Sequence, residues 1–114
     1  MAPEAAALLW DAHAAALEAC GFVQGRNFSD YLTDPMLSAA VERKLEIVGE
    51  ALNQLRKLDA VTAAQIPELP AAVGLRNILI HAYGSVDNRL VWDVATARLP
   101  ELIARIEHLM RAAP

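Results

Sequence analysis

The chain has 114 residues, of which 55% are hydrophobic, and a formal net charge of −4 from 10 basic and 14 acidic side chains. Its length predicts a single domain, residues 1–114, built around one core. The acidity argues against broad nucleic-acid binding, which requires several cations against phosphates. RNA therefore remains a substrate only if basic side chains are concentrated locally, and a cationic partner surface is equally compatible with the charge.

Cysteine content and hydropathy indicate in which compartment the protein is expected. The single Cys20 excludes an internal disulfide and a thiolate metal site, which favours the cytoplasm. The N-terminus lacks the basic start of a signal peptide, and no stretch approaches the roughly 20 uncharged residues of a membrane span. We therefore expect no membrane contact. The hydrophobic excess on so short a chain predicts that a partner or a second copy covers part of the surface.

Abundant alanine and few β-branched or aromatic runs predict an all-α fold. The first helix is expected over residues 3–20, with Gly21 in the left-handed conformation just past its end. A loop with one helical turn around Tyr31 follows. Asp34 and Pro35 then suit the N-cap and first position of the next helix.

The second long helix, residues 35–58, has the clearest periodicity. Its apolar residues alternate steps of four and three, which is typical of one helix packed along another. This seam consists of Val41, Leu45, Val48, Leu52 and Leu55, and it is widened by Ile47, Ala51 and Leu58.

Two more helices are expected in the second half. Pro70 begins one, Gly84 ends it, and Gly74 inside it suggests that another backbone approaches closely there. Asp87 or Asn88 caps the last helix, which Pro100 must kink or split. The apolar face of this helix comprises Val91, Leu99, Leu102, Ile106 and Leu109. The whole pattern predicts an up-and-down bundle of four to five helices.

The segment 76–83 carries most of the chemically capable groups. At about 100° per residue, its four polar side chains fall in a sector of about 160° on one helix. These four are Arg76, Asn77, His81 and Tyr83. The opposite side, expected to face the core, consists of Leu75, Ile78, Leu79 and Ala82.

This set could cleave RNA without a metal ion. Arg76 offers five donors that fit a phosphate, and His81 can exchange a proton near neutral pH. Asn77 can hold the imidazole or a phosphate oxygen, while Tyr83 places a phenol near Arg76. One imidazole cannot readily be base and acid at once, so a symmetric dimer would supply the second.

A purely structural interpretation remains open. Arg76 could pair with Glu46 or Glu50, while His81 caps or fills a groove. The row of Glu42, Glu46 and Glu50 suits a solvated face or an interface better than a carboxylate pair. Of these residues, only Glu50 is an accessory candidate, because it follows Gly49 on a helix expected near the motif.

The remaining candidates are weaker. His13 is interpreted as a surface or core histidine, and His108 as a cation near a helix C-terminus. Trp10 and Trp92 suit core or interface anchors better than base-stacking platforms. The sequence shows no metal cluster, phosphate-binding loop or Ser-His-Asp arrangement.

Arg-Asn-x-x-x-His-x-Tyr resembles the signature of the HepT-like toxins, a branch of the all-helical HEPN superfamily. The similarity covers roughly residues 30–105. Besides the motif, it rests on residues 40–51, which end in Ile/Val-Gly-Glu-Ala, and on Ile66-Pro67, Pro70, Gly74, Val86-Asp87, Val91-Trp92 and Leu99-Pro100.

This resemblance implies a type VII toxin that acts as a metal-independent RNA endonuclease. The acidity of the chain fits a structured target such as tRNA, gripped locally, better than RNA in general. Arg76 and His81 would be catalytic, Asn77 supporting, and two protomers would form the cleft. An MntA-like nucleotidyltransferase antitoxin would transfer AMP from ATP to Tyr83, and the toxin itself would need no cofactor. The alternative is a catalytically weak HEPN subunit that binds a nucleotidyltransferase and nucleotide.

Overall fold

The computed structural model describes residues 1–82 and 84–112, which form helices and connecting loops without a strand. The all-α prediction is therefore confirmed. The helices are α1 (Pro3–Val23), α2 (Phe28–Thr33), α3 (Pro35–Leu58), α4 (Ala60–Ala63), α5 (Leu69–His81), α6 (Asn88–Asp93), a π-helical turn η1 (Val94–Arg98) and α7 (Leu99–Ala112).

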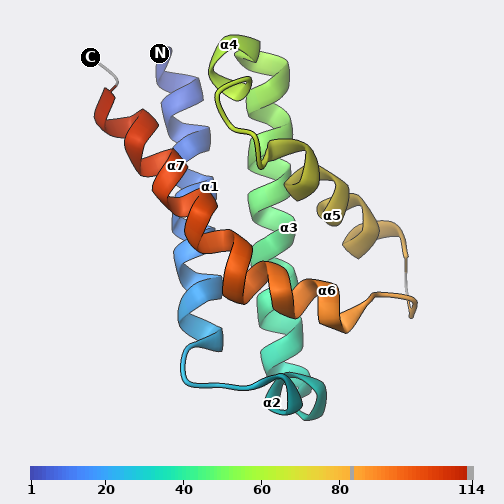
Figure 1. Ribbon diagram of the computed structural model, residues 1–114. Coiled ribbons are helices and arrows are strands. Elements are labelled where there is room, and N and C mark those ends of the chain that lie inside the picture. The colour runs from blue at the N-terminus through green and yellow to red at the C-terminus, as the bar shows by residue number, and fades with distance from the viewer. Residues whose placement is uncertain (83, 113–114) are drawn as a thin grey trace.

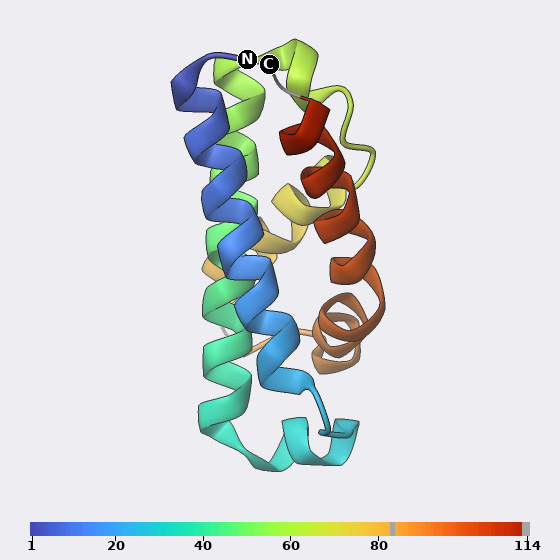
Figure 2. The same ribbon diagram turned by 90° about the vertical axis from the view of Figure 1, so that its left-hand side faces the viewer.

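The long helices alternate in direction, as an up-and-down bundle requires (Figure 1). Helices α1 and α3 lie side by side and make the most extensive contact in the fold. Helix α5 packs on α3, while α7 packs on α1 and crosses it obliquely (Figures 1 and 2). The short helices α2 and α4 lie at opposite ends of α3.

The core follows the predicted periodicity. The whole α3 seam from Val41 to Leu55 is buried. It packs on an alanine-rich stripe of α1, where small side chains let the two backbones approach closely. That stripe is Ala5, Leu9, Ala12, Ala15, Ala16, Ala19 and Val23. The expected core residues of the last helix are buried as well. Leu58 is an exception, because it is 52% exposed at the end of α3.

The first helix is longer than predicted. Gly21 lies within α1, and the left-handed glycine is Gly25, with a φ of 74°. The error arose because the apolar pattern continues through Phe22 and Val23, so the helix still buries a side chain after Gly21.

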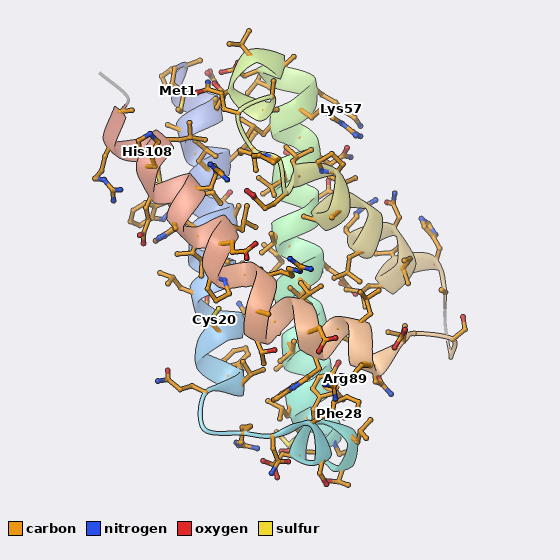
Figure 3. The ribbon with its side chains drawn as sticks, in the orientation of Figure 1. Met1, Cys20, Phe28, Lys57, Arg89 and His108 are labelled. Atoms are coloured by element: carbon orange, nitrogen blue, oxygen red, sulfur yellow. The ribbon has the colours of Figure 1, made fainter. Side chains whose placement is uncertain are left out.

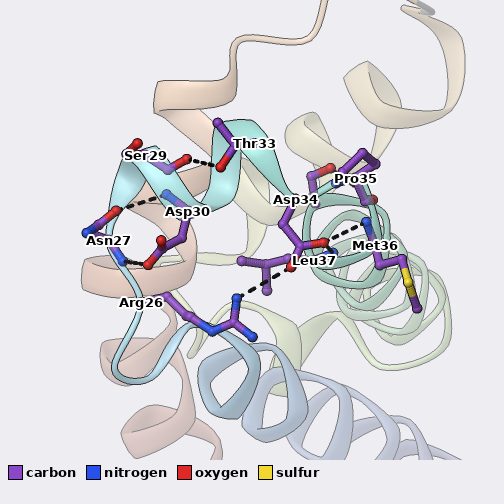
Figure 4. Close-up of polar contacts among 10 residues, drawn as sticks. Arg26, Asn27, Ser29, Asp30, Thr33, Asp34, Pro35, Met36 and Leu37 are labelled. Carbon is purple, nitrogen blue, oxygen red and sulfur yellow. Dashed lines mark hydrogen bonds and ion pairs between the residues drawn. The ribbon is translucent and has the colours of Figure 1, made fainter.

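Side-chain caps hold the N-termini of α2 and α3 (Figure 4). The Asn27 side chain accepts a hydrogen bond from the Asp30 backbone at 2.9 Å, and the Asp30 carboxylate accepts one from the Asn27 backbone. Asp34 caps α3 as predicted, because its Oδ1 accepts from the backbone N–H groups of Met36 and Leu37 at 3.1 and 3.2 Å. These bonds satisfy donors that have no partner within the helix.

The predicted distortion at Pro100 takes the form of η1. The Leu99 N–H donates to Val94 O, one residue further back than in an α-helix. The next bond of that register would need an N–H from Pro100, which has none. Ala95 O accepts instead from the Cys20 thiol of α1, at 3.7 Å (Cys20 is labelled in Figure 3).

An aromatic cluster joins α2 to α6. Trp92, buried as the core-anchor prediction requires, lies with its ring centroid 5.7 Å from Tyr31 and 6.3 Å from Phe28. Arg89 lies 4.8 Å above the Phe28 ring, and both are labelled in Figure 3. Burial raises the pKa of the Tyr31 phenol, and the nearby Glu42 adds to the shift.

Helix α1 corrects the expectation about membrane spans. An 18-residue window of this 21-residue helix has a mean hydropathy of 1.2, so α1 is long and apolar enough to cross a membrane by length and composition alone. The core helix of a soluble protein and a signal sequence near the N-terminus both pass this test; 33% of the window is buried, and α1 packs on α3 and α7.

Candidate functional site

Helix α5 reaches its position because α3 carries a glycine where the two helices meet. A Cβ built on Gly49 would collide with Arg76 Cβ and would lie 2.8 Å from the backbone oxygen of Ala72. Gly49 is therefore the point of close approach. The same role was expected of Gly74, which is wrong: a Cβ there meets nothing within 4 Å, and the residue is exposed.

This contact places the Arg76 side chain beside α3. Its Nη2 forms an ion pair with Glu50 Oε2 at 2.6 Å, and its Nη1 donates a hydrogen bond to Asn77 Oδ1 at 3.0 Å. The Arg76 side chain is 24% exposed. Its Nε is buried and has no hydrogen-bond partner among the described residues. Of the two pairings that the sequence left open, the structure shows the one with Glu50.

Glu50 is itself held by its own helix. Gln54 Nε2 donates to Glu50 Oε1 at 3.0 Å. This hydrogen bond, together with the charges of Arg76 and Lys57, lowers the pKa of the Glu50 carboxyl despite its partial burial. Glu50 is therefore ionised at neutral pH and opposes the charge of Arg76.

Arg76 lines a groove of about 430 Å³ between α1 and α3, to which α5 contributes Arg76 and Ile80. The side chains that line the groove are partly apolar and partly charged. Among the described residues, its walls carry Asp11, Glu18, Arg43, Lys44, Glu46, Glu50 and Arg76. Six of these seven charges form three pairs: Arg43 with Glu46 at 3.2 Å, Lys44 with Glu18 at 3.2 Å, and Arg76 with Glu50. The groove thus has no excess of positive charge.

His81 and Asn77 lie one turn apart on α5, and both are exposed. His81, the last residue of α5, is not among the described residues that line the groove. The structure therefore joins Arg76, Asn77 and Glu50 in direct contact and leaves His81 on the adjoining surface. Tyr83, the expected site of AMP transfer, lies outside the described residues.

The apolar side of α5 is narrower than predicted. Leu75 and Leu79 are buried, but Ile78 is 41% exposed. Leu69 and Val73, which the sequence analysis did not assign to this face, are buried instead. The buried face of α5 therefore begins earlier along the helix than predicted and excludes Ile78.

The structure places the remaining candidate residues outside the contact between Arg76, Asn77 and Glu50. His13 pairs with Glu107 of α7 at 2.8 Å, an acidic partner that the sequence did not reveal. His108 is exposed on the last helix. Trp10 is 62% exposed at the groove, so its core role is wrong and its role as an interface anchor stays a prediction. Within residues 1–82 and 84–112, no group of three His, Cys, Asp or Glu side chains could hold a metal ion.

Comparison with known proteins agrees with this architecture. The sequence model of the family described as "Ribonuclease HepT-like" matches residues 13–109. "Putative RNase TTE0752" of Caldanaerobacter subterraneus subsp. tengcongensis is 34% identical over 99 residues, which cover 83% of this chain and 88% of the relative. "Probable ribonuclease HepT" of Thermococcus cleftensis is 36% identical over 90 residues, covering 74% and 76%. No solved structure matches the chain.

The helical bundle with its Arg-Asn-x-x-x-His segment is therefore a HEPN-type domain. The chain belongs to the ribonuclease HepT-like family. The resemblance drawn from the motif and its flanks is confirmed, and family membership supports ribonuclease activity.

Proposed function

We propose that this protein is a metal-independent RNA endonuclease and the toxin of a type VII toxin–antitoxin pair in the cytoplasm. The observation that carries the proposal is the Arg76 guanidinium, held in the lining of a groove by Glu50 and Asn77, with an exposed histidine five positions later on the same helix. These are the cation and the proton acceptor that phosphodiester cleavage requires.

The chemistry needs no group beyond RNA and two protomers. His81 takes the proton of a ribose 2′-hydroxyl, and the 2′-oxygen attacks the adjacent phosphorus. The bond to the 5′-oxygen breaks, and His81 of a second copy returns a proton to that oxygen. Arg76 stabilises the negative charge that develops on the phosphate. The products are a 2′,3′-cyclic phosphate and a 5′-hydroxyl.

The charge distribution favours a structured target. With Arg76 paired to Glu50 and the groove walls balanced, little long-range attraction for phosphates is available. An RNA such as tRNA, recognised by shape and gripped at a few positions, suits this surface better than an arbitrary single strand.

The direct test is cleavage of purified tRNA by the full-length protein in the presence of EDTA, with end-group analysis. We expect endonucleolytic fragments with 2′,3′-cyclic phosphate ends at undiminished rate. Complete loss of activity in EDTA, regained with Mg²⁺, would refute metal independence. The Arg76→Ala protein serves as the control for contaminating nuclease.

Regulation is proposed to occur at Tyr83. An MntA-like nucleotidyltransferase would transfer AMP from ATP to the phenol, releasing pyrophosphate and adding a bulky negative group seven positions from Arg76. We expect co-expression with that enzyme to add one or more AMP masses and to relieve growth arrest. Mass spectrometry of the Tyr83→Phe protein checks the site, since modification that persists there would place it elsewhere.

One observation favours the alternative of a catalytically weak subunit that binds a nucleotidyltransferase and nucleotide. The charge of Arg76 is already opposed by Glu50, in a groove without excess positive charge. Growth arrest on expression distinguishes the two functions. Arrest that His81→Ala and Arg76→Ala both remove supports the nuclease, whereas arrest that survives both substitutions removes it.

A further inference from the structure

We infer that Glu50 is a positioning residue for Arg76, and that Gln54 and Gly49 complete an α3 bracket that fixes the guanidinium at the groove. The bracket is defined as these three residues, Gly49, Glu50 and Gln54. This inference rests on the proposed function, because it assigns a role in the reaction that Arg76 is proposed to assist.

The first step is the helix contact. Gly49 lets α5 approach until Arg76 Cγ lies 3.0 Å from the position that a Cβ of residue 49 would occupy. The root of the arginine side chain is thereby fixed against α3. Glu50, the next residue on α3, is then within reach of the other end of the same side chain.

The second step is the restraint on the guanidinium. Glu50 contacts Nη2 at 2.6 Å and Asn77 accepts from Nη1 at 3.0 Å, so two different nitrogens are held. Gln54 fixes the carboxylate in turn through its bond to Oε1 at 3.0 Å. A long, flexible side chain thereby loses most of its freedom before any phosphate arrives.

The third step is that the bracket leaves donors free. A guanidinium carries five N–H groups, two on each terminal nitrogen. Asn77 accepts from one N–H of Nη1, whereas the contact of Nη2 with Glu50 Oε2 is an ion pair without hydrogen-bond geometry, so both terminal nitrogens retain a donor for a phosphate oxygen. Glu50 thus orients the cation without consuming its capacity to bind.

Glu46 provides a matched control. It lies one turn before Glu50 on α3 and lines the same groove, but it pairs with Arg43 instead of Arg76. Glu46→Ala and Glu50→Ala therefore remove the same charge from the same groove. Only the second releases Arg76.

The experiment measures cleavage kinetics on tRNA together with the ¹⁵N relaxation of Arg76 Nε, in the wild-type protein and in Glu50→Ala, Glu50→Gln and Glu46→Ala. For Glu50→Ala we expect a loss in kcat of about 10- to 100-fold with KM changed less than about threefold, because misplacing a positioned group affects the transition state most. The Arg76 order parameter should fall in the same variant. Glu50→Gln keeps an acceptor oxygen and should show an intermediate loss, whereas Glu46→Ala, which frees Arg43 instead of Arg76, should keep the wild-type kcat and Arg76 order parameter and lower only KM.

Several outcomes would overturn the inference. Unchanged kcat in Glu50→Ala would remove the positioning role, and a lower KM with a higher rate would show that Glu50 restrains the enzyme instead. An equal loss of kcat in Glu46→Ala would show that the effect comes from the net charge of the groove and not from the position of Arg76. If the wild-type protein cleaves no RNA, the proposed function fails, and an unchanged Arg76 order parameter in Glu50→Ala would then reject the bracket as well. If Glu50→Ala does not fold, Glu50→Gln decides by the same two measurements.

Discussion

Replacing His81 by alanine is expected to lower the rate constant of RNA cleavage by roughly 10²- to 10⁴-fold, the usual contribution of a general acid or base. The loss should be this large because no second titratable group of α5 can replace the imidazole. His81 is exposed at the end of the helix and packs in no core, so the free energy of unfolding should change by less than about 0.5 kcal/mol. Single-turnover cleavage of labelled tRNA and urea denaturation measure the two quantities.

His108→Ala is the matched control for this substitution. His108 is also exposed on a helix but lies on α7, outside the motif helix and the groove. Its replacement should leave cleavage unchanged. His13 would be a poorer control, because its pair with Glu107 links α1 to α7. Equal activity of the His81→Ala and wild-type proteins would remove the proposed mechanism, even if both bind RNA.

The parts of the fold that were predicted are those that local rules determine. The seam of α3 was recognised because a helix repeats its buried face every three or four residues, whatever it packs against. The cap at Asp34 was predicted, and the cap at Asp87 is one of the two alternatives that the sequence offered with Asn88, because a short acceptor beside free N–H groups has the same effect in any helix. The split at Pro100 follows from its missing N–H alone.

The predictions that were wrong concern how helices pack against one another. Sequence spacing could not tell which of Gly49 and Gly74 faces another backbone, because the crossing point of α3 and α5 is a tertiary property. Ile78 was assigned to the core from a helical wheel, but the buried residues of α5 are Leu69, Val73, Leu75 and Leu79, and Ile78 is exposed. Trp10 shows the same limit, since an apolar side chain on an alanine-rich helix gives no sign of which side is covered.

The candidate site was predicted in part for a similar reason. Arg76, Asn77 and His81 are neighbours on one helix, so their grouping could be derived from a period of 3.6 residues. The contact between Arg76 and Glu50 was only one of two alternatives. Glu46 and Glu50 lie one turn apart on α3, and the sequence does not tell which carboxylate reaches Arg76. The pair of His13 and Glu107, 94 positions apart, carried no local signal at all.

Substitution of Gly49, with Gly74 as control, tests whether the close approach of α3 and α5 determines the position of Arg76. Gly49→Ala is expected to lower the free energy of unfolding by about 1–2 kcal/mol, because overpacking costs about 1–3 kcal/mol and the better helix propensity of alanine returns up to about 1 kcal/mol. The new Cβ would lie 2.8 Å from the Ala72 backbone oxygen, so helix α5 itself must move away. Arg76 moves with it, and cleavage should fall by more than the loss of stability explains.

Gly74→Ala is the matched control, because it makes the same change in an exposed helical position with no atom within 4 Å. Only the propensity effect remains there, so stability should rise by about 0.5–1 kcal/mol and cleavage should stay at the wild-type rate. Urea denaturation and tRNA cleavage on both variants separate packing from propensity. A Gly49→Ala protein as stable and active as Gly74→Ala would mean that α5 does not depend on this close approach, and that the placement of Arg76 has another cause.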